Sequence, residues 1–195
     1  MPASRRLSLP WRLLEAYFQR RYQIRILEND PDSLIAYNLY PHQGPDVPLR
    51  CGAVLHSGDL VLEIHFRREA LQRRVTSGDP TRLALTLLHL GDRDVPRLAR
   101  ALEREPELQP VRALHALTLF HRGVERYGFE VQPVRERWSE AWFTAWHRLL
   151  MARDHPNGGK RVREHREKLV TRHVWISREE LRRRFPPPPS RNAGP

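Results

Sequence analysis

The chain has 195 residues, of which 39% are hydrophobic and 29% are charged. At about 150 residues per domain, this length predicts one domain with a trailing segment, and the composition excludes a wholly disordered, collagen-like or coiled-coil chain. The 34 basic residues exceed the 23 acidic residues by 11, and nearly all of the basic residues are arginines. Arginine suits phosphate and carboxylate, which favours an anionic partner, although genomic base composition explains the same bias without one.

The N-terminal segment and the cysteine content bear on the cellular compartment. Cys51 is the single cysteine, which excludes an internal disulfide and a cysteine-rich zinc site. Residues 1–23 lack the apolar run of about 7–15 residues that a signal peptide needs, and no stretch approaches the ~18 apolar residues of a membrane span. We therefore expect a cytoplasmic protein without a membrane span, with an interfacial helix around Trp11 to Tyr22 as the alternative.

Apolar and polar residues alternate in much of the first third of the chain, which indicates strands. A short amphipathic helix is expected before them, because Trp11, Leu14, Phe18 and Tyr22 recur every three or four residues. Short turns join the expected strands, so they predict an antiparallel meander. The helix is expected at 9–22 and the strands at 22–27, 34–40, 49–55 and 60–66.

After residue 66 the apolar spacing changes to about 3.6, which predicts a mainly helical remainder. Helices are expected at 68–74, 80–90, 94–105, 110–127, 135–153 and 178–184, and strands at 129–134 and 172–176. Ser177 and Glu180 form a capping box at the start of the last helix. The fold class is therefore α+β, a single domain over 8–185 with a small N-terminal antiparallel sheet, and the proline-rich tail at 186–195 is expected to be disordered.

Common catalytic and nucleotide-binding motifs are missing from the sequence. It contains no GxGxxG, GxxxxGK[ST], GxSxG, HExxH or CxxC. Asp92-Arg93-Asp94 resembles a metal-binding DxD element, but it falls between two expected helices, where Asp94 can act as an N-cap. We therefore expect no cofactor and favour a protein without catalysis.

The segment from Gly58 to Phe66 contains the best candidate site. Residues two apart share a face of a strand, so Glu63 and His65 are neighbours on the face opposite the core. A carboxylate beside an imidazole can raise the histidine pKa, orient a base or supply two metal ligands. Asp59 precedes them, and His42 or His56 would have to complete a metal site. The alternative is a hydrogen-bonded pair on a half-buried face.

Two further sets of residues lie on expected helices. Trp138, Trp142 and Trp146 are four apart and form one stripe, which we expect to pack in the core. The alternative is a stacking platform for sugar rings or bases, with Trp142 as the ligand-binding candidate. His115 and His121 are six apart, about 240° around one helix, so they are not expected to bind one ion.

Three segments together resemble the YkoP-like domain family: SGDLVLEIHF at 57–66, ALTLFHRGVERYGFEV at 116–131 and VWISREELRRRF at 174–185. This bacterial domain is found alone or joined to polysaccharide deacetylases, so the resemblance implies an association with envelope polysaccharide metabolism. It supplies no catalytic residue. Gly58, Asp59, Glu63 and His65 occupy its most recognisable stretch.

Three functions follow from the sequence. The first is a non-catalytic accessory domain that binds an anionic polymer or a carbohydrate through Asp59, Glu63, His65 and Trp142. The second, less favoured, is a nucleic-acid-binding protein that uses the arginine surplus. The third is a small metal-dependent hydrolase built on Asp59, Glu63 and His65. The sequence predicts no particular oligomeric state.

Overall fold

The computed structural model describes residues 23–74, 80–135, 137–154, 158–164, 167 and 169–187. The helix expected at 9–22 and most of the expected tail lie outside these residues. The elements follow one another as β1 (Arg25–Ile26), η1 (Leu27–Asn29), β2 (Ile35–Pro41), β3 (Val47–Pro48), β4 (Val54–Leu55), β5 (Leu60–Phe66), α2 (Arg68–Arg74), α3 (Pro80–Arg104), η2 (Pro106–Leu108), β6 (Ala113–Thr118), η3 (Val124–Tyr127), β7 (Glu130–Pro133), α4 (Arg137–Asp154), α5 (Gly158–Glu164), β8 (Arg172–Ser177) and α6 (Arg178–Arg184).

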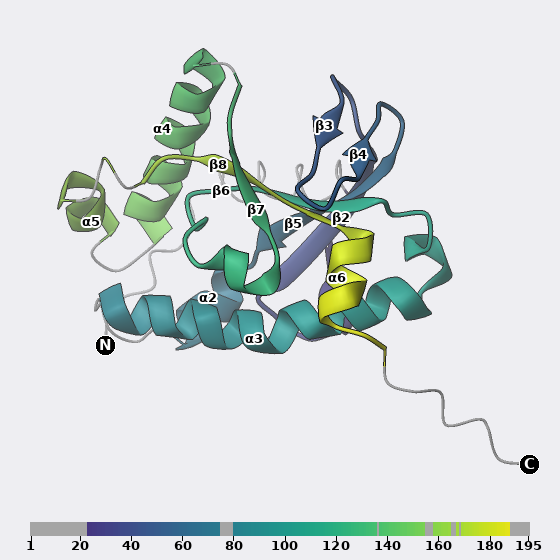
Figure 1. Cartoon of the computed structure of the whole chain (residues 1–195). Coiled ribbons are helices and arrows are strands. Elements are labelled where there is room, and N and C mark those ends of the chain that lie inside the picture. Colours follow the sequence, from purple (N-terminus) through teal and green to yellow (C-terminus); the bar gives the residue numbers. More distant parts are fainter. Residues whose placement is uncertain are drawn as a thin grey trace, which may run out of the picture.

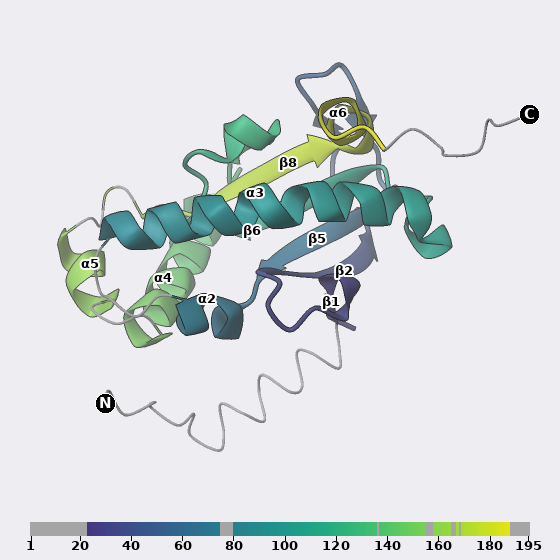
Figure 2. The ribbon, with the colours of Figure 1, turned by 90° about the horizontal axis from the view of Figure 1, so that it is seen from below.

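Six strands form the main sheet, in the order β1-β2-β5-β6-β8-β7, and β3 pairs with β4 separately. Strands β5 and β6 are parallel, and the other neighbours in the main sheet are antiparallel. A hairpin cannot join parallel neighbours, and here the connection runs through α2 and α3. In Figure 1, α3 lies below the sheet, whereas α4 and the β3–β4 pair lie above it. Figure 2 gives the view from below, in which α3 crosses in front of the sheet.

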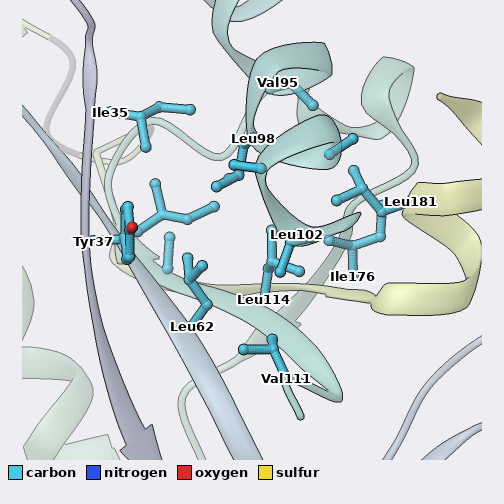
Figure 3. Close-up of a cluster of buried hydrophobic side chains, with 14 of the residues drawn as sticks. Ile35, Tyr37, Leu62, Val95, Leu98, Leu102, Val111, Leu114, Ile176 and Leu181 are labelled. Carbon is cyan, nitrogen blue, oxygen red and sulfur yellow. The ribbon is translucent and has the colours of Figure 1, made fainter. Parts of the chain in front are cut away.

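The main core lies between α3 and the lower face of the sheet. Leu98 and Leu102, one helical turn apart, are fully buried against the strands, and Figure 3 shows them directed at Leu62 and Leu114. Because strand side chains alternate, the residues on either side of Leu62 and Leu114 in the sequence point to the upper face of the sheet. The position of α3 therefore decides which strand residues are left for a site.

The predicted α+β class is confirmed, but the meander is only partly correct. Strands β1, β2 and β5 are antiparallel neighbours as expected, while the strand expected at 49–55 does not join the main sheet. Gly52 adopts a positive φ of 88° and turns the chain in the middle of that segment, so β4 folds back on β3. The remaining half is also less helical than expected, because β6 replaces part of an expected helix and joins the predicted β7 and β8 in the sheet.

Two expected helices at 80–90 and 94–105 are one continuous helix, α3. The turn predicted at Gly91-Asp92-Arg93 is wrong. The glycine lies within the helix, where it lets the side chain of Tyr127 pack closely against the backbone. A Cβ atom at Gly91 would lie 2.6 Å from the hydroxyl oxygen of Tyr127, which packs there. Glycine in this segment therefore reflects tertiary packing, which a local pattern does not reveal.

The helix expected at 110–127 is also wrong, since its first part is β6 and η3 follows. β6 lies between β5 and β8 and is covered on both faces, so almost all of its residues are buried. A strand buried on both sides loses the alternation that identifies strands in a sequence. In contrast, the predicted segments at 34–40, 60–66, 68–74, 129–134, 135–153 and 172–176 agree with β2, β5, α2, β7, α4 and β8 within one or two residues.

Asp94 fastens α3 to the start of β2 and is not a helix cap. Its side chain is fully buried, and Oδ2 accepts hydrogen bonds from the Leu34 amide at 2.7 Å and the Ser33 hydroxyl at 3.1 Å. The guanidinium groups of Arg93 and Arg97 lie 2.7 and 3.3 Å from Oδ1. The buried carboxylate is therefore fully partnered, and it uses both of its oxygens within the fold.

Substitution Asp94→Ala should lower the free energy of unfolding by about 3–5 kcal/mol, because it leaves two buried donors and an arginine without their acceptor. Urea unfolding followed by circular dichroism measures this. The control is Asp92→Ala, two residues earlier on α3. Its half-exposed carboxylate pairs with Arg126 and shares the Tyr127 hydroxyl with the Leu88 carbonyl oxygen, so a change within about 1 kcal/mol is expected. Equal losses for the two variants would contradict the anchoring function of Asp94.

Candidate functional site

The upper face of the main sheet carries a group of polar and aromatic side chains from four adjacent strands. The strand register places Asn38 beside Glu63, Glu63 beside His115, and His115 beside Trp175. These side chains form one row across the sheet, and three neighbours extend it. We call the whole group the histidine cluster: Asn38, Tyr40, Glu63, His65, His115, His173 and Trp175.

The Asn38 amide connects Glu63 and His65. Its Oδ1 accepts a hydrogen bond of 2.5 Å from the Nε2–H of His65, and the same amide hydrogen-bonds the Glu63 carboxylate. The His65 Nε2 also lies 3.8 Å from the Glu63 Oε2. Because Nε2 carries the proton, the Nδ1 of His65 is a hydrogen-bond acceptor.

Burial shifts the pKa values of both groups toward their neutral forms. It lowers the pKa of His65 to about 4, and it raises the pKa of Glu63 against the opposing effect of the Asn38 hydrogen bond. The two side chains are still about one third exposed, at 35% and 28%. His65 is therefore a neutral imidazole at physiological pH, and both groups can reach a ligand.

The second half of the cluster is a chain of hydrogen bonds from Tyr40 through His115 to His173. The Tyr40 hydroxyl lies 3.1 Å from the Nδ1 of His115, and the Nε2 of His115 lies 2.8 Å from the Nδ1 of His173. The His115 ring stacks on Trp175, with ring centroids 4.0 Å apart and an angle of 24°. Both nitrogens of His115 are thus engaged within the protein, which leaves the Nε2 of the less buried His173 as the end of the chain.

Burial also determines the charge of the three hydrogen-bonded groups, Tyr40, His115 and His173. Burial, with a smaller contribution from His173, lowers the pKa of His115 to about 3. Burial likewise lowers the pKa of His173, with help from Arg135, and raises that of Tyr40. All three groups are neutral at pH 7, so the chain can be polarised by a ligand without carrying a charge.

The residues predicted from sequence are only partly brought together. Glu63 and His65 lie in the cluster, but Asp59 sits in the turn before β5, where its carboxylate accepts a hydrogen bond from the His56 amide at 2.8 Å. His42 bonds the Pro45 carbonyl through Nε2, and His56 lies 3.0 Å from Asp46. Among the described residues no group of three or more histidine, cysteine or acidic side chains could hold a metal ion.

Trp142 lies on α4, apart from the strands that form the cluster. The expectation that the tryptophan stripe packs in the core is wrong for two of its members, because the side chains of Trp138 and Trp142 are 73% and 66% exposed. The other side of the helix contacts the segment just before β8, where the Thr144 hydroxyl accepts a hydrogen bond from the Thr171 amide. The spacing correctly placed Trp138 and Trp142 on one side of the helix but not the direction in which that side faces, and Trp146 is partly buried.

Sequence reasoning missed His115, His173, Tyr40 and Asn38. The histidine at 115 was placed on a helix, so its alternation with buried Leu114 and Ala116 carried no meaning. A strand assignment for 113–118 would have placed it on the face of Glu63. The strand expected at 172–176 already put His173 and Trp175 on one face, which was the available signal.

Many arginines of the basic surplus are engaged within the domain. Arg97 pairs with Glu28 and Asp30 at 2.7 Å each, and Arg178 with Glu103 at 3.1 Å. The most basic run, at 182–184, is partly neutralised because two of its three arginines pair with Glu180. This usage favours a structural explanation for part of the arginine content.

A depression in the surface lies elsewhere, between the β3–β4 pair and the start of α6. Its walls include Leu49, Val54, Val111 and Arg112, and the histidine cluster does not contribute to it. No helix in the described part of the chain is long and apolar enough to cross a membrane.

Comparison with known proteins gives one family. The model of the YkoP domain matches residues 5–185. "Uncharacterized protein YkoP" of Bacillus subtilis strain 168 is 22% identical over 122 residues, which cover 62% of this chain and 67% of that protein. No solved structure matches the chain. Because the family model covers nearly the whole sequence, including every strand of the histidine cluster, the chain belongs to the YkoP domain family.

Proposed function

We propose that this chain is a non-catalytic binding domain whose histidine cluster holds a neutral, hydroxyl-rich ligand, of which a carbohydrate is the best example. The observation that carries the proposal is the hydrogen-bonded chain from Tyr40 through His115 to His173. It ends at a partly exposed imidazole, and burial keeps both imidazoles of this hydrogen-bonded chain neutral. An association with bacterial envelope polysaccharide is the corresponding biological setting.

The Nε2 of His173, at the end of the hydrogen-bonded series from Tyr40 to His173, can act as a donor or as an acceptor. When the Tyr40 hydroxyl donates to Nδ1 of His115, Nε2 of His115 donates to His173 and the Nε2–H of His173 points outward as a donor. When both tautomers are reversed, the same Nε2 becomes an acceptor. A sugar hydroxyl both donates and accepts, so it fits either state without a change in net charge.

Charge argues against an anion at this position. The imidazoles are neutral because burial lowers their pKa values, and Glu63 adds a carboxyl group to the same face. An anionic ligand would meet no positive charge from the cluster itself and would lie beside this carboxyl group. We therefore narrow the ligand from an anionic polymer or a carbohydrate to the neutral alternative.

Titration of the full chain with a neutral oligosaccharide, cellohexaose or chitohexaose, tests the proposal by NMR. Shifts of the His65 and His173 ring signals are expected. His173→Ala should weaken binding roughly 2- to 12-fold, the effect of one hydrogen bond of about 0.5–1.5 kcal/mol. His56→Ala is the matched control, because His56 is exposed and outside the cluster.

Salt separates this function from the polyanion and nucleic-acid alternatives. Binding of the neutral oligosaccharide should be nearly constant between about 50 mM and 500 mM NaCl, whereas binding of polygalacturonate or a short RNA through arginines would fall more than about tenfold. Salt-sensitive polyanion binding without any response to the neutral oligosaccharides would refute the carbohydrate proposal.

The neutral state of His115 also predicts a pH dependence of stability. Its folded pKa of about 3 lies below an unfolded value of about 6.5, so the unfolded chain binds a proton that the folded chain does not. The stabilisation is complete above pH 6.5 and is lost as the pH falls, by at most about 2 kcal/mol between pH 7 and pH 5.

The His115→Gln variant, which keeps a donor and an acceptor but does not titrate, should lose less stability over this pH range than the parent chain. Urea unfolding at pH 7, 6 and 5 measures the difference, and His56→Gln at an exposed position is the control. Parallel curves for the parent and His115→Gln would show that His115 is not held neutral by burial.

A further inference from the structure

The outward face of α4 is apolar over the side chains that the structure describes there, at 138–149. Trp138, Trp142 and Leu149 are 73%, 66% and 56% exposed, and Ala145 between them is also exposed. At 100° per residue these four side chains fall within a sector of about 60°. We call them the α4 stripe. In Figure 1, α4 stands at one end of the molecule, above the sheet.

Three polar residues of α4 contact the domain instead of facing the solvent. Glu140 pairs with Arg172, Thr144 accepts a hydrogen bond from the Thr171 amide, and the Nδ1 of His147 lies 3.0 Å from the Thr171 hydroxyl oxygen. The inner side also carries the buried Met151, so α4 has large apolar residues on both sides, whereas a surface helix ordinarily keeps them on the buried side. An exposed apolar face with two tryptophans is typical of a surface that another molecule covers.

The spacing of the α4 stripe indicates what covers it. Steps of four, three and four residues separate its members, which is the a/d spacing of a helix that packs against a second helix. Ala145 leaves room at the centre of the stripe, opposite the bulk of the tryptophans. A flat partner such as a bilayer surface would require neither the seam spacing nor the small central residue.

The stripe is complementary to itself when a second copy is turned by a two-fold axis. In an antiparallel pair centred between residues 143 and 144, Trp142 packs on Ala145 of the other copy and Trp138 packs on Leu149 of the other copy. Each layer then joins a large residue to a smaller one, as in the a–d layers of antiparallel helix pairs. We propose that α4 is a homodimer interface of this antiparallel geometry.

The size of the stripe predicts how strong the dimer is. With about 150–250 Å² per tryptophan and two thirds of it exposed, each copy contributes roughly 300–450 Å² including Leu149. The total of roughly 600–900 Å² is below the 1,200–2,000 Å² of stable complexes. The dimer is therefore weak and reversible, and it forms at high protein concentration.

Sedimentation equilibrium of the full chain from about 5 µM to 500 µM tests the interface. We expect a monomer–dimer equilibrium that Trp142→Glu weakens at least about tenfold, because the carboxylate would be buried against Ala145 of the other copy. Leu85→Glu is the matched control: Leu85 is 60% exposed on α3 and outside the stripe, so dimerisation should be unchanged.

Exchanging the residues at positions 142 and 145 distinguishes the specific pairing from nonspecific hydrophobic association. Trp142→Ala and Ala145→Trp should each weaken the dimer, the first by removing the large residue and the second by opposing two tryptophans. The double variant should restore it, because the layer is again one tryptophan on one alanine. Circular dichroism confirms that each variant is folded.

A chain that stays monomeric up to 500 µM, or a dimer that Trp142→Glu leaves intact, would overturn the proposal. So would a double variant that dimerises no better than either single variant. Sedimentation with vesicles of phosphatidylcholine and phosphatidylglycerol provides the remaining comparison: vesicle binding that requires Trp142, by a chain that remains monomeric, would assign the stripe to a membrane surface instead.

Discussion

The contact between α3 and one face of the main sheet is the constraint on which the other features depend. Leu98 and Leu102 bury the leucines of β5 and β6 on that face, and the two-residue period of a strand then leaves no choice for their neighbours. Glu63 and His115 must lie side by side on the opposite face. The site is therefore a consequence of how the core is formed, and it needs no loop to assemble it.

Burial of that polar face then determines its chemistry. A buried imidazole is costly when charged, and the fold offers each histidine an uncharged partner: an amide for His65 and a phenol for His115. These partners satisfy the buried nitrogens and fix or couple the tautomers. The result is a set of neutral imidazole donors and acceptors held in place by strands, which is the form of pre-organisation that the proposed neutral, hydroxyl-rich ligand requires.

Two of the seven residues of the histidine cluster could be predicted from the sequence, and the failure for the others has a physical explanation. β5 keeps its apolar alternation because its upper face is half-buried, so Glu63 and His65 were recognised as neighbours. β6 is covered on both faces, and its run of buried residues reads as well for a helix. The parallel pairing of β5 with β6, which brings His115 to Glu63, spans a connection of more than 40 residues and leaves no local signal.

The orientation of α4 could not be predicted from its own sequence for a similar reason. The partners of its polar side, Thr171 and Arg172, come from another part of the chain. The dimer proposed for the exposed side of α4 is linked to the proposed ligand. A polymer presents the same sugar unit many times, so a dimer that carries two histidine clusters can engage one polymer chain twice. Each engagement raises the local concentration of the second copy, and the polymer thus favours the dimer by mass action. A weak site and a weak interface would then reinforce each other, and neither needs to be strong alone.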